Sequence, residues 1–558
     1  MDSILIVDAF STGINYINDV IDRNYQPVVL YERLPEDHQK TFDDWRERIK
    51  NRYKSKAIFI DEEDTFEKTI QLVKKYDPKY VVPGSEGGVE LAMRVTAALG
   101  LPGNDVNNIP NFTKKDCMHA ALKKYGIRYI KGELVDNLEQ ALEFFDKNKL
   151  KGAVVKPTHG AGSVGVRLCD SREELITAYN EVCNAVNMFG EKDVKILIQE
   201  KIEGTEYIVN TVSYNGVHRL ASIWRYKKKT VKGGGRAYDY CESINSLETG
   251  CSRLVRYAFD TCDAIGFTYG AVHGEYMVDE NGPVLIETNC RPMGGGMPAD
   301  YVDRIFGHHE TDNILDTYLH PEWHMEMAKK PYKTYEYAVA KDFIVKQDTN
   351  VNALPVLTVV RHLKSFHSAE LAGSIGGQLA RTVDLETSGG TINLVHPDPL
   401  VLDHDLQYLR RIEKEYFSVF FGNDNMSKED MPENMDSVKE IIDKYNCVGS
   451  VIVLTNEKDL DVNAVIADEN TIDDSQNKFS YGIMDMIYDE KIGSEEYVDL
   501  FYRLVDRIRT GGKIIVPQRS YWHFPHNVEG IEAIAEAVNL KIEAPTVEDK
   551  NVVIITKR

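Results

Sequence analysis

The sequence lacks the features that place a chain in a membrane or outside the cytoplasm. None of its 558 residues belong to a run of about 18 uninterrupted apolar residues, the length that a membrane-spanning helix needs. The first ten residues, MDSILIVDAF, have no cationic stretch, long apolar core or small-residue cleavage site of a signal peptide. The eight cysteines form no CxxC pair, which disfavours a zinc site and a disulfide framework. We therefore expect a reduced, cytoplasmic protein.

Positive charge is also scarce. The chain has 66 Lys and Arg against 88 Asp and Glu, a net charge of −22. A non-specific nucleic-acid binder needs a basic face that displaces counterions, so we expect no nucleic-acid partner and no docking on anionic lipid. A phosphate-rich ligand would require positive side chains concentrated at one place. With 42% apolar residues the chain can bury several cores, in roughly three to four domains.

The periodicity of the chain indicates an α/β protein with several domains. Short apolar runs at 3–7, 27–31, 57–60 and 80–82 alternate with amphipathic stretches, which is typical of a parallel sheet covered by helices. We assign residues 1–113 to a Rossmann-like domain. A helix is then expected from near Thr113, with Met118, Leu122 and Tyr125 on one face and Gly126 at its end.

The rest of the chain divides into further segments. Strands are expected at 153–155, 195–198 and 207–213, a helix at 254–265, and a hairpin of strands 274–278 and 284–287. Residues 335–422 are mainly β in pattern, with a helix at about 403–416. Residues 426–438 form an acidic linker, and 439–558 return to αβ alternation.

A glycine-rich loop follows Lys156 at the end of a predicted strand. Such a loop can present backbone N–H groups to phosphate oxygens because glycine allows close approach. The alternative is an ordinary turn whose glycines only satisfy its geometry. The candidate phosphate-binding residues of this loop are Gly160, Gly162, Ser163 and Gly165.

Two glutamates stand on the predicted hairpin strands. Glu275 and Glu287 can face one another across antiparallel strands, and Asn289 points the same way as Glu287. Two carboxylates and an amide oxygen suit Mg²⁺ that bridges nucleotide phosphates. Arg291, in phase with them, can stabilise charge that develops on a transferring phosphoryl group. The alternative is a pair of exposed strand glutamates and a surface arginine.

The order and spacing of these elements over about residues 1–425 resemble the ATP-grasp superfamily. The sequence resembles most closely the branch of L-amino acid ligases and carnosine-synthase-type enzymes, on the segments 81–92, 291–296 and 388–405. The resemblance implies that Lys115 and Lys156 bind nucleotide phosphates and that residues 160–165 form a mobile lid. It implies an adenine hinge and ribose contact at Gln199, Glu200, Ile202 and Glu206, metal ligands at Glu275, Glu287 and Asn289, and catalytic roles for Arg291, Glu287 and Lys156.

The resemblance further implies ATP and Mg²⁺, with Mn²⁺ as a substitute, and an acylphosphate intermediate that an amine converts to an amide. The substrates would be an amino acid and a second amino acid or amine. The implied domains are a pre-ATP-grasp domain (1–113), an ATP-grasp core (114–330, lid at about 128–205) and a closing subdomain (331–425). The alternatives are carboxylation with bicarbonate, condensation of another carboxylate, or ATP-binding regulation without turnover.

Four residues are candidate substrate contacts. Glu86 is placed to hold a substrate ammonium, or alternatively is an acid that favours a helix N-terminus. Gly294 and Gly295 offer N–H groups to a carboxylate. Arg236 follows the glycine-rich segment 232–235, which is either a loop closing over the site or a solvated loop.

The segment 439–558 lies outside this resemblance. Its pattern resembles the second half of a Rossmann-like methyltransferase, but no GxGxG element follows the predicted strand at 450–454. We interpret it as a degenerate domain for dimerisation, substrate delivery or partner docking, and expect a homodimer.

Overall fold

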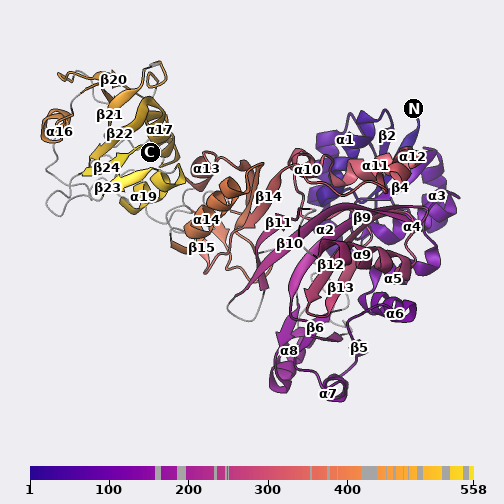
Figure 1. Ribbon diagram of the computed structural model, residues 1–558. Coiled ribbons are helices and arrows are strands. Elements are labelled where there is room, and N and C mark those ends of the chain that lie inside the picture. The colour runs from indigo at the N-terminus through magenta and orange to yellow at the C-terminus, as the bar shows by residue number, and fades with distance from the viewer. Residues whose placement is uncertain are drawn as a thin grey trace. The chain divides into compact units, whose positions relative to one another are not determined.

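The computed structural model describes the chain in two compact units, Met1–Ala338 with Val383–Glu386, and Val339–Thr382 with Thr387–Arg558 (Figure 1). Each unit is described by itself. The description leaves out residues 35, 158–164, 185–195, 232–235, 246–247, 249, 352–354, 374–376, 386, 416–436, 448, 456–459, 469, 475–476, 487–493, 518–527, 539 and 544–551.

The first unit begins with a parallel sheet in strand order β3-β2-β1-β4. The four predicted strands are confirmed as β1 (Ser3–Val7), β2 (Gln26–Tyr31), β3 (Ile58–Asp61) and β4 (Pro78–Pro83). Every residue of β1 is buried, as the uninterrupted apolar run requires. The accompanying helices are α1 (Asn15–Asp22), α2 (Glu36–Tyr53), α3 (Phe66–Lys74) and α4 (Gly88–Ala98).

The loops after β1 and β4 meet at the carboxyl edge of this sheet. Because β1 lies between β2 and β4, the strand order reverses at β1, and in open sheets of this kind ligands bind beside the loops at such a position. A side chain at Gly84 would place its Cβ 2.6 Å from the Asp8 carbonyl oxygen. Glycine at this position therefore lets the short 3₁₀ helix η1 (Ser11–Ile14) lie close to the segment that carries Glu86.

Two short helices, α5 (Ile109–Thr113) and α6 (Lys115–Tyr125), lead to a second sheet. The predicted helix and its end at Gly126 are confirmed, with Met118 and Leu122 buried and Tyr125 53% exposed. Tyr125 is the last helical residue before Gly126, whose φ of 89° ends the helix, so its side chain passes beyond the packed face. The antiparallel sheet has the order β5 (Gly132–Val135), β8 (Ile196–Glu200), β6 (Ala153–Pro157), β7 (Arg167–Cys169), with α7 (Leu138–Lys147) and α8 (Arg172–Asn184).

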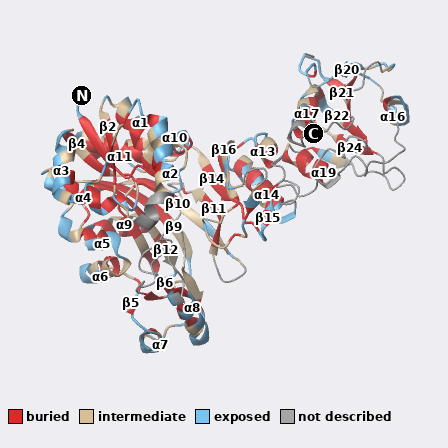
Figure 2. Cartoon of the chain, turned by 180° about the vertical axis from the view of Figure 1, so that it is seen from behind, coloured by how far each residue is buried: buried red, intermediate tan, exposed pale blue. Residues whose placement is uncertain are grey.

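A larger antiparallel sheet forms the centre of the first unit, and Figure 2 shows its strands as a mixture of buried and intermediate residues. Its order is β13 (Gly282–Asn289), β12 (Gly270–Asp279), β9 (Thr205–Tyr214), β10 (Val217–Thr230), β11 (Arg236–Ser243). Helix α9 (Cys251–Ile265) packs its predicted apolar face into the core beside these strands. Three helices follow: α10 (Ala299–Phe306), α11 (Glu310–Leu319) and α12 (Pro321–Met327).

The chain passes into the second unit within β14 (Tyr337–Asp342). This part contains β16 (Phe366–Leu371) paired with β18 (Gly390–His396), β15 (Thr349–Asn350) paired with β17 (Gln378–Leu379), and α14 (Pro399–Glu415), the predicted closing helix. The mainly β prediction missed α13 (Pro355–Val360). Its β-branched residues Val356, Val359 and Val360 favour a strand by propensity, but they are fully buried at helical spacing.

The C-terminal part of the second unit is a six-stranded sheet in the order β20 (Val465–Ala467), β19 (Val451–Thr455), β21 (Phe479–Asp485), β22 (Ile508–Pro517), β24 (Val552–Thr556), β23 (Lys541–Glu543). Four strands are parallel and β24 runs against them. The predicted αβ alternation is confirmed by this sheet with α16 (Val438–Lys444), α17 (Ser494–Arg507) and α19 (Val528–Ala537).

This sheet docks on the helices that precede it. The Tyr408 hydroxyl of α14 donates a buried hydrogen bond of 2.8 Å to the carbonyl of Ala533 in α19. The ring of His362, just after α13, lies 4.0 Å from the ring of Tyr502 in α17, measured between centroids. The closing helices and the C-terminal sheet are therefore packed parts of one unit.

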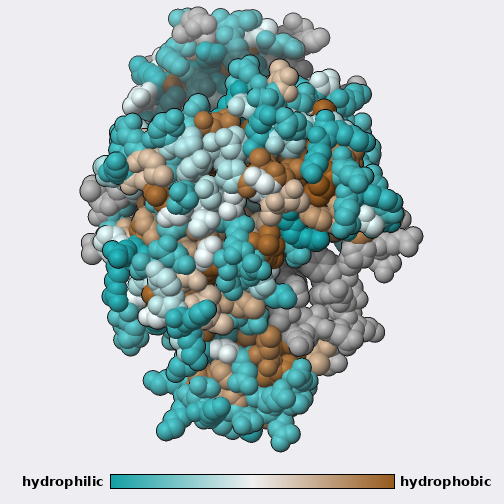
Figure 3. Space-filling view, turned by 90° about the vertical axis from the view of Figure 1, so that its right-hand side faces the viewer, coloured by the Kyte–Doolittle hydropathy of each residue, from teal (hydrophilic) through white to brown (hydrophobic). Residues whose placement is uncertain are grey.

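The surface is predominantly hydrophilic on the face that Figure 3 shows. Within the described parts of the chain, no helix combines the length and the apolar character needed to cross a bilayer.

Candidate active site

The hairpin β12–β13 brings the two predicted carboxylates face to face. Glu275 and Glu287 are direct partners across the strands, and a β-bulge follows Glu275. Asn289 lies two residues beyond Glu287 on the same face and is opposite His273. The side chains of Glu275 and Glu287 are 17% and 18% exposed, so they border an accessible space rather than the core. Two carboxylates and an amide oxygen are a donor set that fits Mg²⁺.

Lys115, the first residue of α6, supplies positive charge beside this pair. Its Nζ lies 2.8 Å from Glu287 Oε2. Burial opposes the ammonium charge, but the neighbouring Glu287 carboxylate outweighs it and raises the pKa of Lys115. In the free protein, the Lys115 ammonium group thus occupies a position beside Glu287 where a metal ion would also be attracted.

Lys156, at the end of β6, is the second predicted phosphate lysine and is only 6% exposed. Burial, together with the nearby charge of Lys115, lowers the pKa of Lys156 to about 8, although Glu287 and Glu275 partly compensate. An anion placed between the two ammonium groups would relieve this repulsion. The arrangement is suited to bind phosphate.

His119 is a neighbour that the sequence reasoning missed. It is 5% exposed and lies near the Ile286 backbone of β13. Burial and the charge of Lys156 lower the pKa of His119 to about 3, so its ring is neutral. One feature of the sequence could have pointed to His119. It stands four residues after Lys115 in the predicted helix, so the two side chains lie on the same face.

His273 lies two residues before Glu275 on β12 and contacts it. The distance from His273 Nε2 to Glu275 Oε1 is 3.4 Å. Burial alone would favour the neutral acid, but His273 and the ammonium groups of Lys228 and Lys115 lower the pKa of Glu275 to about 2. The carboxylate is therefore charged and ready for a cation at neutral pH.

The predicted adenine hinge lies where β8 ends and β9 begins. Gln199 is buried, while Glu200 accepts a 2.9 Å hydrogen bond from the Lys131 backbone N–H through Oε1. Ile202 is half-buried between the two strands. This junction joins the β5–β8 sheet to the central sheet, as a hinge requires.

Glu206, the predicted ribose contact, is paired with Lys228 of β10 at 2.7 Å. Burial opposes the charge of Lys228, but Glu206 outweighs it and raises the pKa of Lys228. Sequence reasoning did not single out Lys228, because it stands in a run of three lysines. Only the alternation of side chains along a strand, which places Lys228 on the opposite face from its two neighbours, could have distinguished it.

Part of the predicted lid lies outside the described residues: Gly160, Gly162 and Ser163. Gly165 is described and has a φ of 72°, a left-handed conformation that favours glycine. The glycines of the 232–235 loop are also outside the description. Arg236 begins β11 and is half-buried.

Two of the four predicted substrate residues, Glu86 and Gly294, lie beside Arg291. The Nη2 atom of Arg291 lies 3.2 Å from Glu86 Oε2, a contact between the segment that follows β4 and the segment that follows β13. A Cβ built on Gly294 would lie 3.7 Å from Arg291 Nη1, and Gly295 has a φ of 87°. The side chain of Glu86 is 49% exposed, so it remains accessible to a ligand.

Comparisons with known proteins agree with this arrangement. Residues 151–300 match the family model described as an ATP-grasp domain. The chain is 24% identical to dapdiamide A synthase of Enterobacter agglomerans over 354 residues, which are 63% of this chain and 83% of that protein. It is 22% identical to alanine–anticapsin ligase of Bacillus subtilis over 46% of this chain and 57% of that protein.

The fold is also similar to a solved structure. The L-amino acid ligase from Bacillus licheniformis matches with a TM-score of 0.56 and 17% identity, over 74% of this chain and 97% of that one. About a quarter of the chain therefore has no counterpart in that structure.

Proposed function

We propose, from the premise that this chain is an ATP-grasp ligase, that it joins the carboxylate of an amino acid to the amino group of a second amino acid or amine and forms ADP. The observation that carries the proposal is the pairing of Glu275 with Glu287 across β12 and β13, beside Lys115. The names of two relatives, a dapdiamide synthase and an alanine–anticapsin ligase, support an amide-bond-forming reaction.

In the first half-reaction, the substrate carboxylate attacks the γ-phosphorus of ATP. The bond from phosphorus to the bridging oxygen breaks, and ADP leaves with its electron pair. Lys115 and Lys156 would hold the phosphates, and Mg²⁺, held by Glu275, Glu287 and Asn289, would neutralise their charge. The chain needs no serine or cysteine nucleophile, because positioning and electrostatics supply the catalysis.

In the second half-reaction, an amine attacks the acyl carbon of the acylphosphate. The carbon–oxygen bond to phosphate breaks, phosphate leaves, and the nitrogen loses a proton to give the amide. Arg291 would stabilise the negative charge of the tetrahedral intermediate. Glu86, Gly294, Gly295 and Arg236 remain candidate substrate contacts. Of these, Glu86 is supported by its position 3.2 Å from Arg291.

The proposal includes a cytoplasmic homodimer with domains at 1–113, 114–330 and 331–425, an acidic linker at 426–438 and a degenerate Rossmann domain at 439–558. The mostly parallel six-stranded sheet of the C-terminal segment supports the Rossmann-like assignment there.

A phosphate-release screen tests the reaction. The protein is incubated with ATP, Mg²⁺ and pairs of amino acids, with bicarbonate as a separate arm, and products are identified by mass spectrometry. We expect ADP formation that depends on both amino acids and a product of their combined mass less one water. ADP formation that no amino acid stimulates would contradict the proposal.

Glu287→Gln tests the metal site. It removes a charge that faces both Lys115 and the proposed ion while keeping the shape of the side chain, so turnover should fall at least about a hundredfold. Glu280→Gln, in the exposed turn of the same hairpin, is the matched control and should stay active. An active Glu287→Gln enzyme would show that the metal assignment is wrong.

A further inference from the structure

Four polar side chains form a row across one face of the central sheet. Ser222 of β10 is opposite Asn210 of β9, and Asn210 is opposite His273 of β12. His273 is in turn opposite Asn289 of β13, one of the predicted metal ligands. Residues directly opposite one another in an antiparallel sheet point to the same face. All four are buried, between 1% and 8% exposed, so each needs hydrogen-bond partners within the protein.

Glu310, at the start of α11, contacts the two members of this row that are farthest from Asn289. Its Oε1 accepts hydrogen bonds from Asn210 Nδ2 at 3.0 Å and from Ser222 Oγ at 3.1 Å. Asn210 Nδ2 also donates to Ser222 Oγ at 2.8 Å. Because these oxygens accept, the amide nitrogen of Asn210 must point to them, and its amide oxygen must point the other way.

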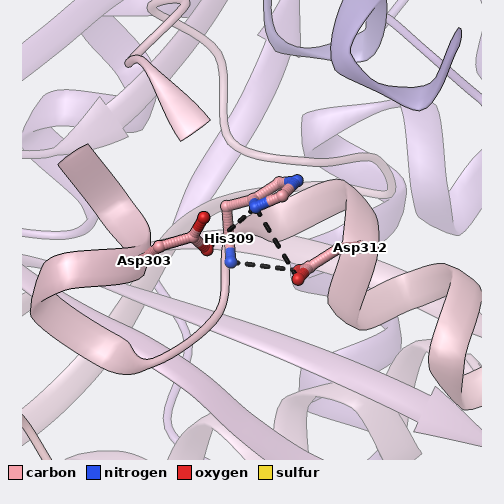
Figure 4. A group of neighbouring side chains, drawn as sticks. All are labelled: Asp303, His309 and Asp312. Atoms are coloured by element: carbon pink, nitrogen blue, oxygen red, sulfur yellow. Dashed lines mark hydrogen bonds and ion pairs between the residues drawn. The ribbon is translucent and has the colours of Figure 1, made fainter. Parts of the chain in front are cut away.

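The first turn of α11 holds Glu310 in place through the residue before it. The backbone N–H of His309 donates to Asp312 at 3.0 Å, and His309 Nδ1 lies 2.9 Å from Asp303 (Figure 4). His309 Nε2 lies 3.1 Å from Asp19 of α1. The start of α11 is therefore fixed by three contacts, and Glu310 gives the row a fixed end.

The orientation of Asn210 in turn determines the orientation of His273. Asn210 Oδ1 lies 2.9 Å from His273 Nδ1, and an amide oxygen only accepts, which assigns a proton to Nδ1. The ring is thereby held with its Nε2 beside Glu275, whose Oε1 is 3.4 Å away. A carboxylate that is held through Oε1 can offer Oε2 to a metal ion. Ordering the side chain in advance lowers the entropic cost of binding that ion.

We propose that Asn210 and His273 are positioning residues of the magnesium site. They hold the Glu275 carboxylate in the orientation that binds the ion, with Glu310 as their anchor. The inference rests on the proposed function, because Glu275 is a metal ligand there. Both residues act through Glu275, so the property they control is the affinity of the site for its metal ion.

Two substitutions of His273 separate positioning from packing. In His273→Gln, the amide nitrogen can take the place of Nε2 and keep the contact with Glu275. In His273→Asn, it can take the place of Nδ1 and keep only the bond to Asn210. The measurement is the dissociation constant for Mn²⁺, obtained by electron paramagnetic resonance with ADP present and with a protein-free sample as the blank.

We expect this dissociation constant to rise at least about tenfold in His273→Asn and less than about threefold in His273→Gln. A histidine that only packs in the interior predicts the opposite order, because His273→Asn keeps the buried bond to Asn210. Equal Mn²⁺ affinities in the two variants, or the opposite order, would overturn the proposal.

His218 supplies a matched control on the same sheet. Its Nδ1 lies 2.7 Å from Ser213 Oγ and its Nε2 lies 3.2 Å from Asp263 Oδ1, so its ring is held at both nitrogens, as that of His273 is. His218→Asn should lower the melting temperature and leave the Mn²⁺ dissociation constant unchanged. If it weakens Mn²⁺ binding as much as His273→Asn does, lost stability explains both effects and the proposal is overturned.

Asn210→Ala tests whether Asn210 acts through His273, and it keeps the proposal falsifiable if the His273 variants do not fold. It removes the acceptor for His273 Nδ1, so the Mn²⁺ dissociation constant should rise at least about fivefold. In the His273→Asn background, where the contact with Glu275 is already lost, it should add less than about twofold. An unchanged affinity in Asn210→Ala, or equal losses in both backgrounds, would overturn the proposal.

The wild-type protein distinguishes failure of this inference from failure of the proposed function. ADP formation that no amino acid stimulates would contradict the proposed function, while Mn²⁺ binding would still report whether His273 positions Glu275. Wild-type protein that binds no Mn²⁺ above the protein-free blank would overturn the inference, whatever its activity.

Discussion

The buried charge of Lys156 destabilises the free protein, and the same charge would favour binding of an anion such as a phosphate group. Its ammonium group is almost fully buried, and the nearby charge of Lys115 adds to the cost. Phosphate oxygens placed between the two lysines would remove both penalties at once. The site therefore exchanges some stability of the free protein for affinity towards an anion.

Lys156 predicts the pH dependence of ATP use. Its pKa of about 8 means that the free protein loses this charge as pH rises through about 8. Only the ammonium form attracts phosphate, so kcat/KM for ATP should fall about tenfold per pH unit above this point. The arginine of the Lys156→Arg variant stays charged throughout this range. The fall of kcat/KM for ATP above about pH 8 should therefore be absent from that variant. If kcat/KM for ATP falls with pH in the same way in both proteins, Lys156 is not the titrating group.

At the scale of elements, the interface of α13 and α14 with α17 and α19 determines how the C-terminal sheet is held. The hydrogen bond from Tyr408 of α14 to Ala533 of α19 is buried. On the other side of the interface, Tyr502 of α17 donates a buried bond of 2.8 Å to the carbonyl of Ile534, which holds α17 against α19. Arg411 of α14 is also ion-paired with Glu536 of α19. The sheet is a packed extension of the closing helices, and its removal would expose their apolar faces.

Tyr408→Phe should weaken this interface. The substitution keeps the ring but leaves the buried Ala533 carbonyl without a donor, which costs about 1–3 kcal/mol. Hydrogen exchange followed by mass spectrometry should show faster exchange in α14 and α19. Tyr125→Phe changes an exposed ring at the end of α6 and should leave these rates unaltered. Unchanged protection in Tyr408→Phe would mean that the bond does not hold the interface.

At the scale of the whole molecule, the charge of −22 conceals a strongly uneven distribution. Lys115, Lys156 and Lys228 are all buried or nearly buried, and each has a glutamate carboxylate among its neighbours. The acidic excess opposes binding to polyanions but does not oppose one nucleotide, because these lysines act at short range where solvent does not screen them.

His309 predicts how the stability of the first unit depends on pH. Its ion pairs to Asp19 of α1 and to Asp303 connect the N-terminal sheet to the central domain. Because the folded pKa is raised from 6.5 to about 10, this stabilisation is complete below about pH 6.5 and is lost as pH rises through about 10.

His309→Gln should therefore lower the free energy of unfolding by a few kcal/mol at about pH 6.5, and by much less near pH 10.5. Urea denaturation across this range measures the difference. His404→Gln, with a side chain 53% exposed on α14, is the control and should have little effect at any pH. A penalty that does not change with pH would show that His309 is not held as a cation.

The sequence by itself determined the local elements and the pairing of Glu275 with Glu287. Strand alternation and a hairpin turn fix which residues face one another, so short-range rules sufficed. The order of the motifs also indicated the ATP-grasp superfamily, whose family model matches residues 151–300, and it predicts nucleotide-binding roles for Lys115 and Lys156. Helix α13 was missed because its valines are typical of a strand, and only burial favoured the helix.

Only the tertiary structure revealed His119 beside Lys156 and the contact of Glu86 with Arg291. Glu86 and Arg291 are 205 residues apart in the chain. No periodicity encodes such contacts. They arise because the segment after β4 and the end of β13 come together only once the apolar faces of their elements are buried.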